Sequence, residues 1–198
     1  MAAVDETYIG SYPLWERCHS YADLLAANLA FLKGEIHDTP YHLGPICTET
    51  RPILENIKKI NERGFLTTGS QPSLKEGDIY LQRSYITGFI KLDNKDSIID
   101  FATKNNMHIK VFYKNNIIYN SFPVPRFCVT YDTDEQGKLH EFTWLQSRQG
   151  DDVLEDLTTG FHQFNNIVQI LQGYAYVEIA NSEWNDVEVS ELLADYLQ

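Results

Sequence analysis

Apolar residues recur at helical spacing in two segments near the N-terminal end of the chain. The first stripe is interrupted by Asn28 and consists of Leu24, Leu25, Leu29 and Leu32. Ser20 is a suitable N-cap for it and Gly34 a suitable stop, so we expect a helix there. The second stripe is formed by Ile53, Leu54, Ile57 and Ile60, with Pro52 in the first turn and Gly64 as the C-cap. Residues 35–49 between the two helices contain two prolines and a glycine and are expected to form a loop.

Further along the chain, β-branched and aromatic residues alternate with polar ones, which favours strands. A short strand is expected at 65–68, followed by an exit loop at 69–73 and a turn at 74–78. Later strands are expected at 79–91, 108–113, 117–119, 127–131, 139–146 and 174–180. Further helices are expected to start at 93–96 and to cover 161–171 and 186–197. Two pairs of these strands are separated by short polar turns and are expected to be hairpins.

This order of elements predicts an α+β fold with an antiparallel or mixed sheet flanked by helices and a helical N-terminal lead-in. We expect one compact domain over residues 1–198. Pro123 and Pro125 mark a break, so a subdivision into residues 1–122 and 123–198 stays open.

The composition is that of a globular protein, with 198 residues of which 43% are hydrophobic. The longest apolar runs are too short to span a bilayer, and the N-terminus does not read as a secretory signal. The three cysteines are scattered, without disulfide or metal-ligand spacing. We therefore expect a soluble cytoplasmic protein with no membrane partner and no bound metal.

The net charge of -12 lies entirely in the C-terminal third. Residues 1–130 contain 14 acids and 14 bases, whereas residues 131–198 contain 14 acids and two bases. Such a segment repels phosphate backbones, so direct nucleic-acid binding is not expected there. The segment is either a solvated face, or a docking surface for a basic partner or a nucleic-acid mimic. The carboxylates at 151–156 are read in the same way, as an exposed acidic run rather than a cation site.

A group of polar residues at 67–73 is the best candidate for a ligand site. Hydroxyls, a glycine and an amide follow the expected strand there, and Gln82 and Arg83 lie on the strand that returns. The candidate ligand-binding residues are Thr68, Ser70, Gln71, Gln82 and Arg83. Spacing alone favours a polar turn for this segment, and Arg83 could equally form a salt bridge to Glu49, Glu76 or Asp78. No phosphate-loop motif is present, and no cofactor is identified.

Other reactive residues give weaker signals. Cys47 follows a Gly-Pro turn, and His42 precedes it by five residues, but a nucleophile pair requires contact in space. A lone cysteine is more often a small apolar filler, which is the interpretation we favour for Cys47. The remaining histidines lack the spacing of a metal site.

The ordered motifs ETRPIL (49–54), INERGFLTTGSQP (60–72) and QRSYITGF (82–89) resemble an uncharacterised bacterial domain family. The resemblance covers roughly residues 15–95 and departs at Ser73, where that family usually has glycine. It implies a shared architecture and no particular reaction.

Two functions are therefore carried forward. The first is binding of a small or nucleotide-like ligand at the 67–73 segment with Gln82 and Arg83. It predicts that alanine at Gln71 and Arg83 removes binding and leaves the thermal midpoint nearly unchanged. The second is a protein-interaction role for the acidic C-terminal third, which predicts strongly salt-sensitive association. Catalysis and the oligomeric state stay open.

Overall fold

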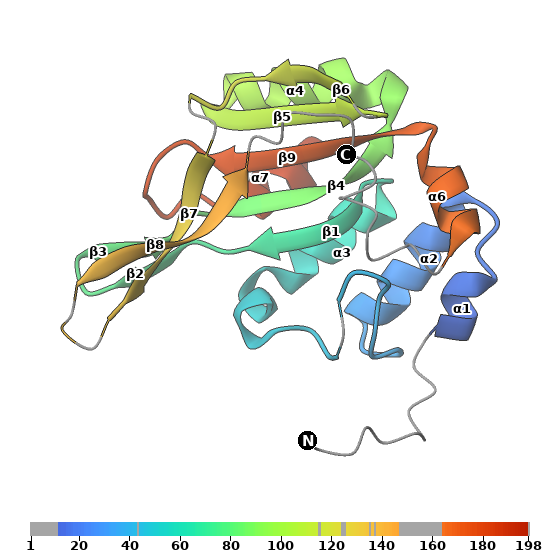
Figure 1. The fold of residues 1–198 in the computed structure, drawn as a ribbon, viewed down its shortest axis with the longest axis horizontal. Coiled ribbons are helices and arrows are strands. Elements are labelled where there is room, and N and C mark those ends of the chain that lie inside the picture. Colours follow the sequence, from blue (N-terminus) through green and yellow to red (C-terminus); the bar gives the residue numbers. More distant parts are fainter. Residues whose placement is uncertain are drawn as a thin grey trace.

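The centre of the molecule is a five-stranded antiparallel sheet (Figure 1). The structure is a computed structural model that describes residues 12–42, 44–114, 116–123, 126–134, 136, 138–146 and 164–197. The strands of this main sheet, in spatial order, are β1 (Leu66–Gln71), β4 (Tyr85–Lys91), β9 (Tyr174–Asn181), β5 (Met107–Tyr113) and β6 (Asn116–Asn120). Strand β1 is therefore an edge strand.

A second antiparallel sheet of four strands extends from one end of the main sheet as an arm (Figure 1). Its strands, in spatial order, are β2 (Leu74–Glu76), β3 (Ile79–Gln82), β7 (Arg126–Thr133) and β8 (Leu139–Gln146). All of β2 is exposed, so the arm depends on its junction with the main sheet for buried contacts.

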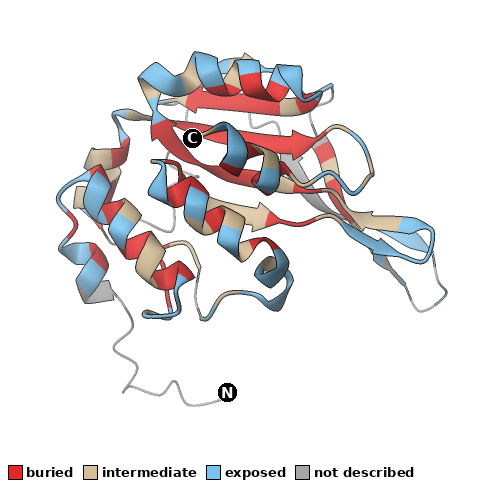
Figure 2. Ribbon diagram, turned by 180° about the vertical axis from the view of Figure 1, so that it is seen from behind, coloured by how far each residue is buried: buried red, intermediate tan, exposed pale blue. Residues whose placement is uncertain are grey.

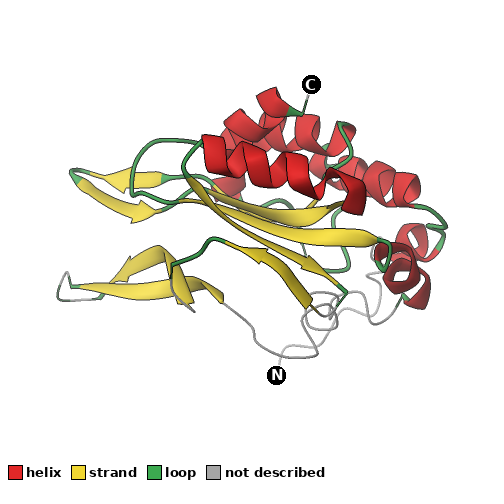
Figure 3. Ribbon diagram, turned by 90° about the horizontal axis from the view of Figure 1, so that it is seen from above, coloured by secondary structure: helices red, strands yellow, loops and turns green. Residues whose placement is uncertain are grey.

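Helices cover the main sheet and one of its ends (Figure 3). One apolar cluster joins the sheet to α3 (Leu54–Glu62), α4 (Lys95–Lys104) and α7 (Val189–Tyr196) through residues such as Ile57, Phe101 and Leu193. A second cluster joins it to α1 (Tyr12–Glu16), α2 (Tyr21–Leu32) and α6 (Asn165–Leu171). Val111 belongs to the first cluster and Phe112 to the second. Since neighbouring strand residues point to opposite faces, the two clusters lie on the two faces of the sheet. The buried residues run through the strands and the inner sides of the helices (Figure 2).

The α+β class with helices flanking antiparallel sheets is confirmed. The expected helix over 21–33 forms with a complete capping box between Ser20 and Asp23. Gly64 ends α3 with φ 92°, a conformation that favours glycine. Both expected hairpins form, as β5–β6 and β7–β8.

Several boundaries differ from the sequence prediction. The segment predicted as an exit loop is largely strand, because β1 continues through a bulge near Thr68 to Gln71. The predicted turn at 74–78 begins with strand β2. The 3₁₀-helices η1 (Thr48–Ile53) and η2 (Leu92–Asn94) precede α3 and α4. The single strand predicted over 79–91 is two strands, β3 and β4, which belong to different sheets.

The split between β3 and β4 has a clear cause in the backbone hydrogen bonds. Arg83 N donates to Val129 O of the arm at 2.8 Å, whereas Ser84 O accepts from Asn181 N of the main sheet at 2.9 Å. The chain changes its partner strand between these two residues. An alternating sequence pattern contains no information about which strand pairs with which, so the two strands looked like one.

Strand pairing also crosses the possible domain boundary near residue 122. Strands β2 and β3 precede that point and pair with β7 after it, and β9 lies between β4 and β5. Both sheets are thus built from both halves of the chain. Within the described residues, no helix is long and apolar enough to cross a membrane.

Candidate functional site

Strand β1 is the edge of the main sheet, and its beginning is sealed by side chains. The Tyr21 hydroxyl accepts from Leu66 N at 3.1 Å and donates to Phe89 O at 2.5 Å. It therefore stands between β1 and β4 where the two strands start to pair. Burial raises the pKa of Tyr21 far above its ordinary value.

At the next residue, Thr67, a network of amide and hydroxyl groups bonds to the backbone of β1. Asn61 accepts from Thr67 N at 3.2 Å, and Asn28 donates to Thr67 O at 3.1 Å. Asn28 also donates to Asn61 at 2.8 Å, and the Tyr41 hydroxyl lies within hydrogen-bond distance of both Asn28 Oδ1 and Thr67 O. Asn28 and Asn61 are buried, so their amides are locked by these bonds. The network fixes the position of Tyr41 over the edge of the sheet.

Directly beyond this network a pocket opens with a volume of about 170 Å³. It takes in four consecutive residues of β1, from Thr67 to Ser70, together with Tyr85 at the start of β4. Its apolar wall comes from α2, α3 and the loop before η1, through Phe31, Leu32, Ile46 and Ile57. The remaining lining residues carry polar groups and are Asn28, Tyr41, His42, Cys47, Glu49 and Thr50.

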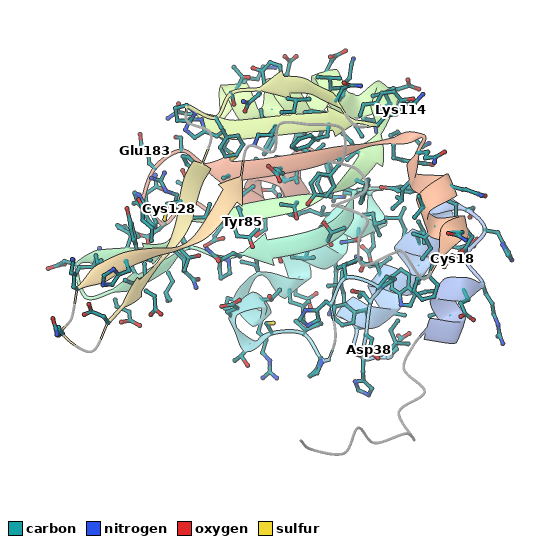
Figure 4. All side chains as sticks on the ribbon, viewed as in Figure 1. Cys18, Asp38, Tyr85, Lys114, Cys128 and Glu183 are labelled. Carbon is teal, nitrogen blue, oxygen red and sulfur yellow. The ribbon has the colours of Figure 1, made fainter. Side chains whose placement is uncertain are left out.

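Several of the polar groups that line this pocket are available to a ligand. Among the described residues, the side chains of Glu49, Ser70 and Tyr85 make no hydrogen bond or ion pair with the protein. Burial, together with the negative charges of Glu49 and Glu178, raises the pKa of Tyr85 to about 12. Tyr85 is therefore a neutral hydrogen-bond donor at physiological pH. Its side chain is labelled at the base of the arm in Figure 4.

Thr68 connects the pocket to polar groups on the face of the sheet. Its hydroxyl lies 3.2 Å from that of Thr87 on β4, and the Tyr176 hydroxyl bonds to both. Next along this row, Lys110 and Glu178 form a buried ion pair with a nitrogen–oxygen distance of 3.6 Å. A row of polar side chains thus crosses the main sheet from β1 to β5.

Gln71, by contrast, lies at the junction of the two sheets and is not among the residues that line this pocket. Its side chain is 6% exposed. The amide nitrogen donates to Arg83 O and Val129 O at 3.1 Å each, and the amide oxygen accepts from Thr130 Oγ1 at 2.9 Å. These bonds join β1 to β7, so the Gln71 side chain connects the two sheets.

Arg83 has aromatic and backbone partners. Its guanidinium stacks on the Phe127 and Trp184 rings, with centroid distances of 4.6 and 4.3 Å, and donates to Ser182 O. Burial lowers the pKa of Arg83. No salt bridge to Glu49, Glu76 or Asp78 forms within the described residues.

Gln82 is half-buried on β3, opposite Thr130. Thr68 and Ser70 therefore line the pocket, while Gln71, Gln82 and Arg83 form a separate group at the base of the arm. Ligand binding by any of the five residues stays a prediction.

Comparison with protein families gives one match. The model of a domain of unknown function, DUF6919, matches residues 11–196. The chain belongs to this family. A search of curated proteins returned no match. The DUF6919 match extends well beyond the 15–95 range of the motif resemblance and includes the acidic C-terminal third.

The pocket also contains reactive residues that gave weak signals in the sequence. Cys47 is exposed and lines the pocket, so the interpretation as an apolar filler is wrong for this residue. His42 lines the same pocket, and its Nε2 lies 3.1 Å from Pro45 O. Within the described part of the chain, no three histidine, cysteine or acidic side chains lie close enough to hold a metal ion.

Several acidic residues of the C-terminal third have internal partners. Glu188 accepts from Ser73 N at 2.8 Å and Ser73 Oγ at 2.7 Å, and from Ser84 Oγ at 2.9 Å. Asp186 accepts from the Tyr80 hydroxyl at 3.1 Å. The acidic run at 151–156 lies outside the described residues. Docking of a basic partner stays a prediction.

Asn28, Tyr41 and Asn61 position the pocket, and the sequence did not indicate them as site residues. Only Asn28 gave a signal, because it breaks an otherwise apolar helical stripe. In the structure this break is the point where α2 bonds to the edge of the sheet.

Proposed function

We propose that this protein binds a small polar molecule in the pocket at the edge of β1. The observation that carries the proposal is the convergence of Ser70, Tyr85 and Glu49, none of which has an internal partner among the described residues, on one pocket. Unpaired polar groups beside an apolar wall are the usual composition of a ligand site. The neighbouring network of Asn28, Tyr41 and Asn61 holds the pocket in shape before a ligand arrives.

The size and charge of the pocket favour a particular class of ligand. Its 170 Å³ is below the roughly 300 Å³ at which pockets enclose drug-sized molecules, so the ligand is small. Among the described residues, no lysine or arginine lines the pocket, and Glu49 contributes a negative charge. An uncharged amide or a primary amine therefore suits it better than a phosphate group. This makes a nucleotide-like ligand bound through its phosphates the less favoured choice for this pocket.

The proposal is tested with a fragment set of small amines and amides, observed by ligand-detected NMR. We expect several fragments to bind and to compete with one another for the same site. Their affinity is expected to fall in the Ser70→Leu variant, because the leucine side chain fills the polar side of the pocket. Glu49→Gln is expected to weaken the cationic hits and to spare the neutral ones. Glu76→Gln, an exposed carboxylate on the arm, is the matched control and is expected to change neither.

The outcome that contradicts the proposal is equally specific. If no fragment binds with a Kd below about 5 mM, or if Ser70→Leu leaves all hits unchanged while the variant remains folded, the pocket is not a ligand site. Circular dichroism and the urea midpoint of each variant establish that the fold is retained.

A further inference from the structure

A second concave surface lies on the other side of the wall formed by Phe31, Leu32 and Ile46, and its charge is opposite to that of the pocket. This groove has a volume of about 280 Å³. Its lining comes from the end of α2, the loop after it, η1 and the start of α3. The basic residues that line it are Lys33, His37, Arg51 and Lys58, and none of its lining residues within the described chain is acidic.

This gathering of cations contrasts with the net charge of -12 carried by the whole protein. Lys58 is partly neutralised, because its Nζ lies 2.8 Å from Glu55 Oε1. That carboxylate is 78% exposed and outside the lining of the groove, so it screens only one of the cations. Lys33 and Arg51 make no ion pair within the described residues and are both exposed. Two cations are therefore free to bind an anion.

The apolar walls of the groove strengthen the attraction between its cations and an anion. Phe31, Ile36 and Leu54 form apolar walls beside the charged side chains. A charge interaction beside apolar surface is stronger than one in open solvent, because the local dielectric constant is lower. Arg51 adds a planar fork of N–H donors that matches the oxygens of a carboxylate or phosphate. A flat surface with scattered lysines would have neither property.

We propose that this groove binds the oxyanion group, phosphate or carboxylate, of a small molecule. The inference rests on the residues of the groove alone and does not require the pocket on the other side of Phe31 to be occupied. The two concave surfaces share Phe31, Leu32 and Ile46 as a common wall.

The experiment uses the full chain and two probes, pyrophosphate and citrate, titrated by isothermal calorimetry at low ionic strength. Saturable binding to one site is expected, and added sodium chloride is expected to weaken it. Arg51→Gln and Lys33→Gln are each expected to weaken binding about tenfold, the size of one lost charge-assisted hydrogen bond. Both residues are exposed, so the variants are expected to fold normally.

Lys104→Gln, which removes an exposed lysine at the end of α4, is the control and is expected to bind both probes like the parent. Tighter binding of pyrophosphate identifies phosphate as the preferred oxyanion, and tighter binding of citrate identifies a carboxylate. The proposal is overturned if neither probe saturates by about 10 mM, or if Lys104→Gln weakens binding as much as Arg51→Gln does. In the second case the attraction is diffuse and not a property of the groove.

Discussion

Replacing Gln71 by alanine is predicted to destabilise the junction of the two sheets. The buried amide makes hydrogen bonds with Arg83 O, Val129 O and Thr130 Oγ1 at 2.9–3.1 Å. Alanine leaves Arg83 O and Thr130 Oγ1 without this partner in a buried position, whereas Val129 O keeps its bond from Arg83 N. Each unsatisfied group costs about 1–3 kcal/mol, in part relieved by local adjustment. We expect the free energy of unfolding to fall by about 3 kcal/mol. For a chain of this size that corresponds to a decrease in Tm of roughly 6–12 °C.

The measurement is urea denaturation followed by far-UV circular dichroism and by tryptophan fluorescence. Trp184, one of three tryptophans in the chain, stacks on Tyr131 of β7 with a centroid distance of 4.7 Å, so part of the fluorescence signal reports on the junction. If the arm separates before the main sheet unfolds, the two signals will not coincide, and the fluorescence midpoint will move further than the other.

Gln82→Ala is the matched control. This glutamine lies on the neighbouring strand β3 and is half-buried, and its side chain makes no hydrogen bond within the described residues. Its replacement is expected to cost less than about 0.5 kcal/mol. The structural reasoning is refuted if Gln71→Ala stays within 0.5 kcal/mol of the parent, by the same scale, or if both variants lose equal stability. An unchanged Tm for Gln71→Ala would restore the expectation drawn from the sequence.

Three further changes test other parts of the structure by thermal or urea unfolding. Gly88→Ala places a Cβ 2.2 Å from Leu66 O. Because this contact is to backbone, we expect the free energy of unfolding to fall by about 3 kcal/mol or more. A decrease below about 1 kcal/mol would contradict the close packing of β1 on β4. Tyr21→Phe removes the hydroxyl between Leu66 N and Phe89 O and is expected to cost about 1–3 kcal/mol, whereas an unchanged midpoint would show that the hydroxyl does not seal the strand pair. His108 has a pKa lowered from 6.5 by burial, so the unfolded chain binds a proton more readily and stability falls as the pH drops below 6.5. His108→Gln should therefore lose less Tm than the parent between pH 7.5 and 5.5, and an identical slope would exclude this histidine as a source of the acid sensitivity.

The sequence predicts those parts of the fold that depend on local chemistry. Ser20 caps α2 and Gly64 ends α3, because capping requires only a side chain or a conformation at one position. The hairpins β5–β6 and β7–β8 form because their strands are adjacent in sequence. The pairing of β9 between β4 and β5 joins residues far apart in the chain, and no local pattern contains that information.

The candidate site residues also differ in how far the sequence predicts their role. Thr68 and Ser70 were proposed because hydroxyls gather at the end of a predicted strand, and both line the pocket. Gln71 and Arg83 were proposed from the same density of polar residues, yet their side chains bond to backbone carbonyls or stack on rings from distant segments. The sequence shows that a polar group is present. Only the tertiary structure shows whether the protein itself already provides its partner.

The position of the pocket follows from how this protein protects its edge strand. An unpaired strand edge exposes backbone groups that can pair with other chains, so proteins normally cover it. Here the side chains of Asn28 and Asn61 take up the backbone groups of Thr67, and this cover ends where β1 bulges near Thr68. The next residues of the edge line a pocket and are not capped by side chains of α2 or α3. A cover that stops part-way along a strand leaves polar groups beside an apolar wall, which is the arrangement on which we base the proposal of a ligand site. For this reason the loss of bound fragments in Ser70→Leu, with the fold retained, is the most direct test of what the protein does.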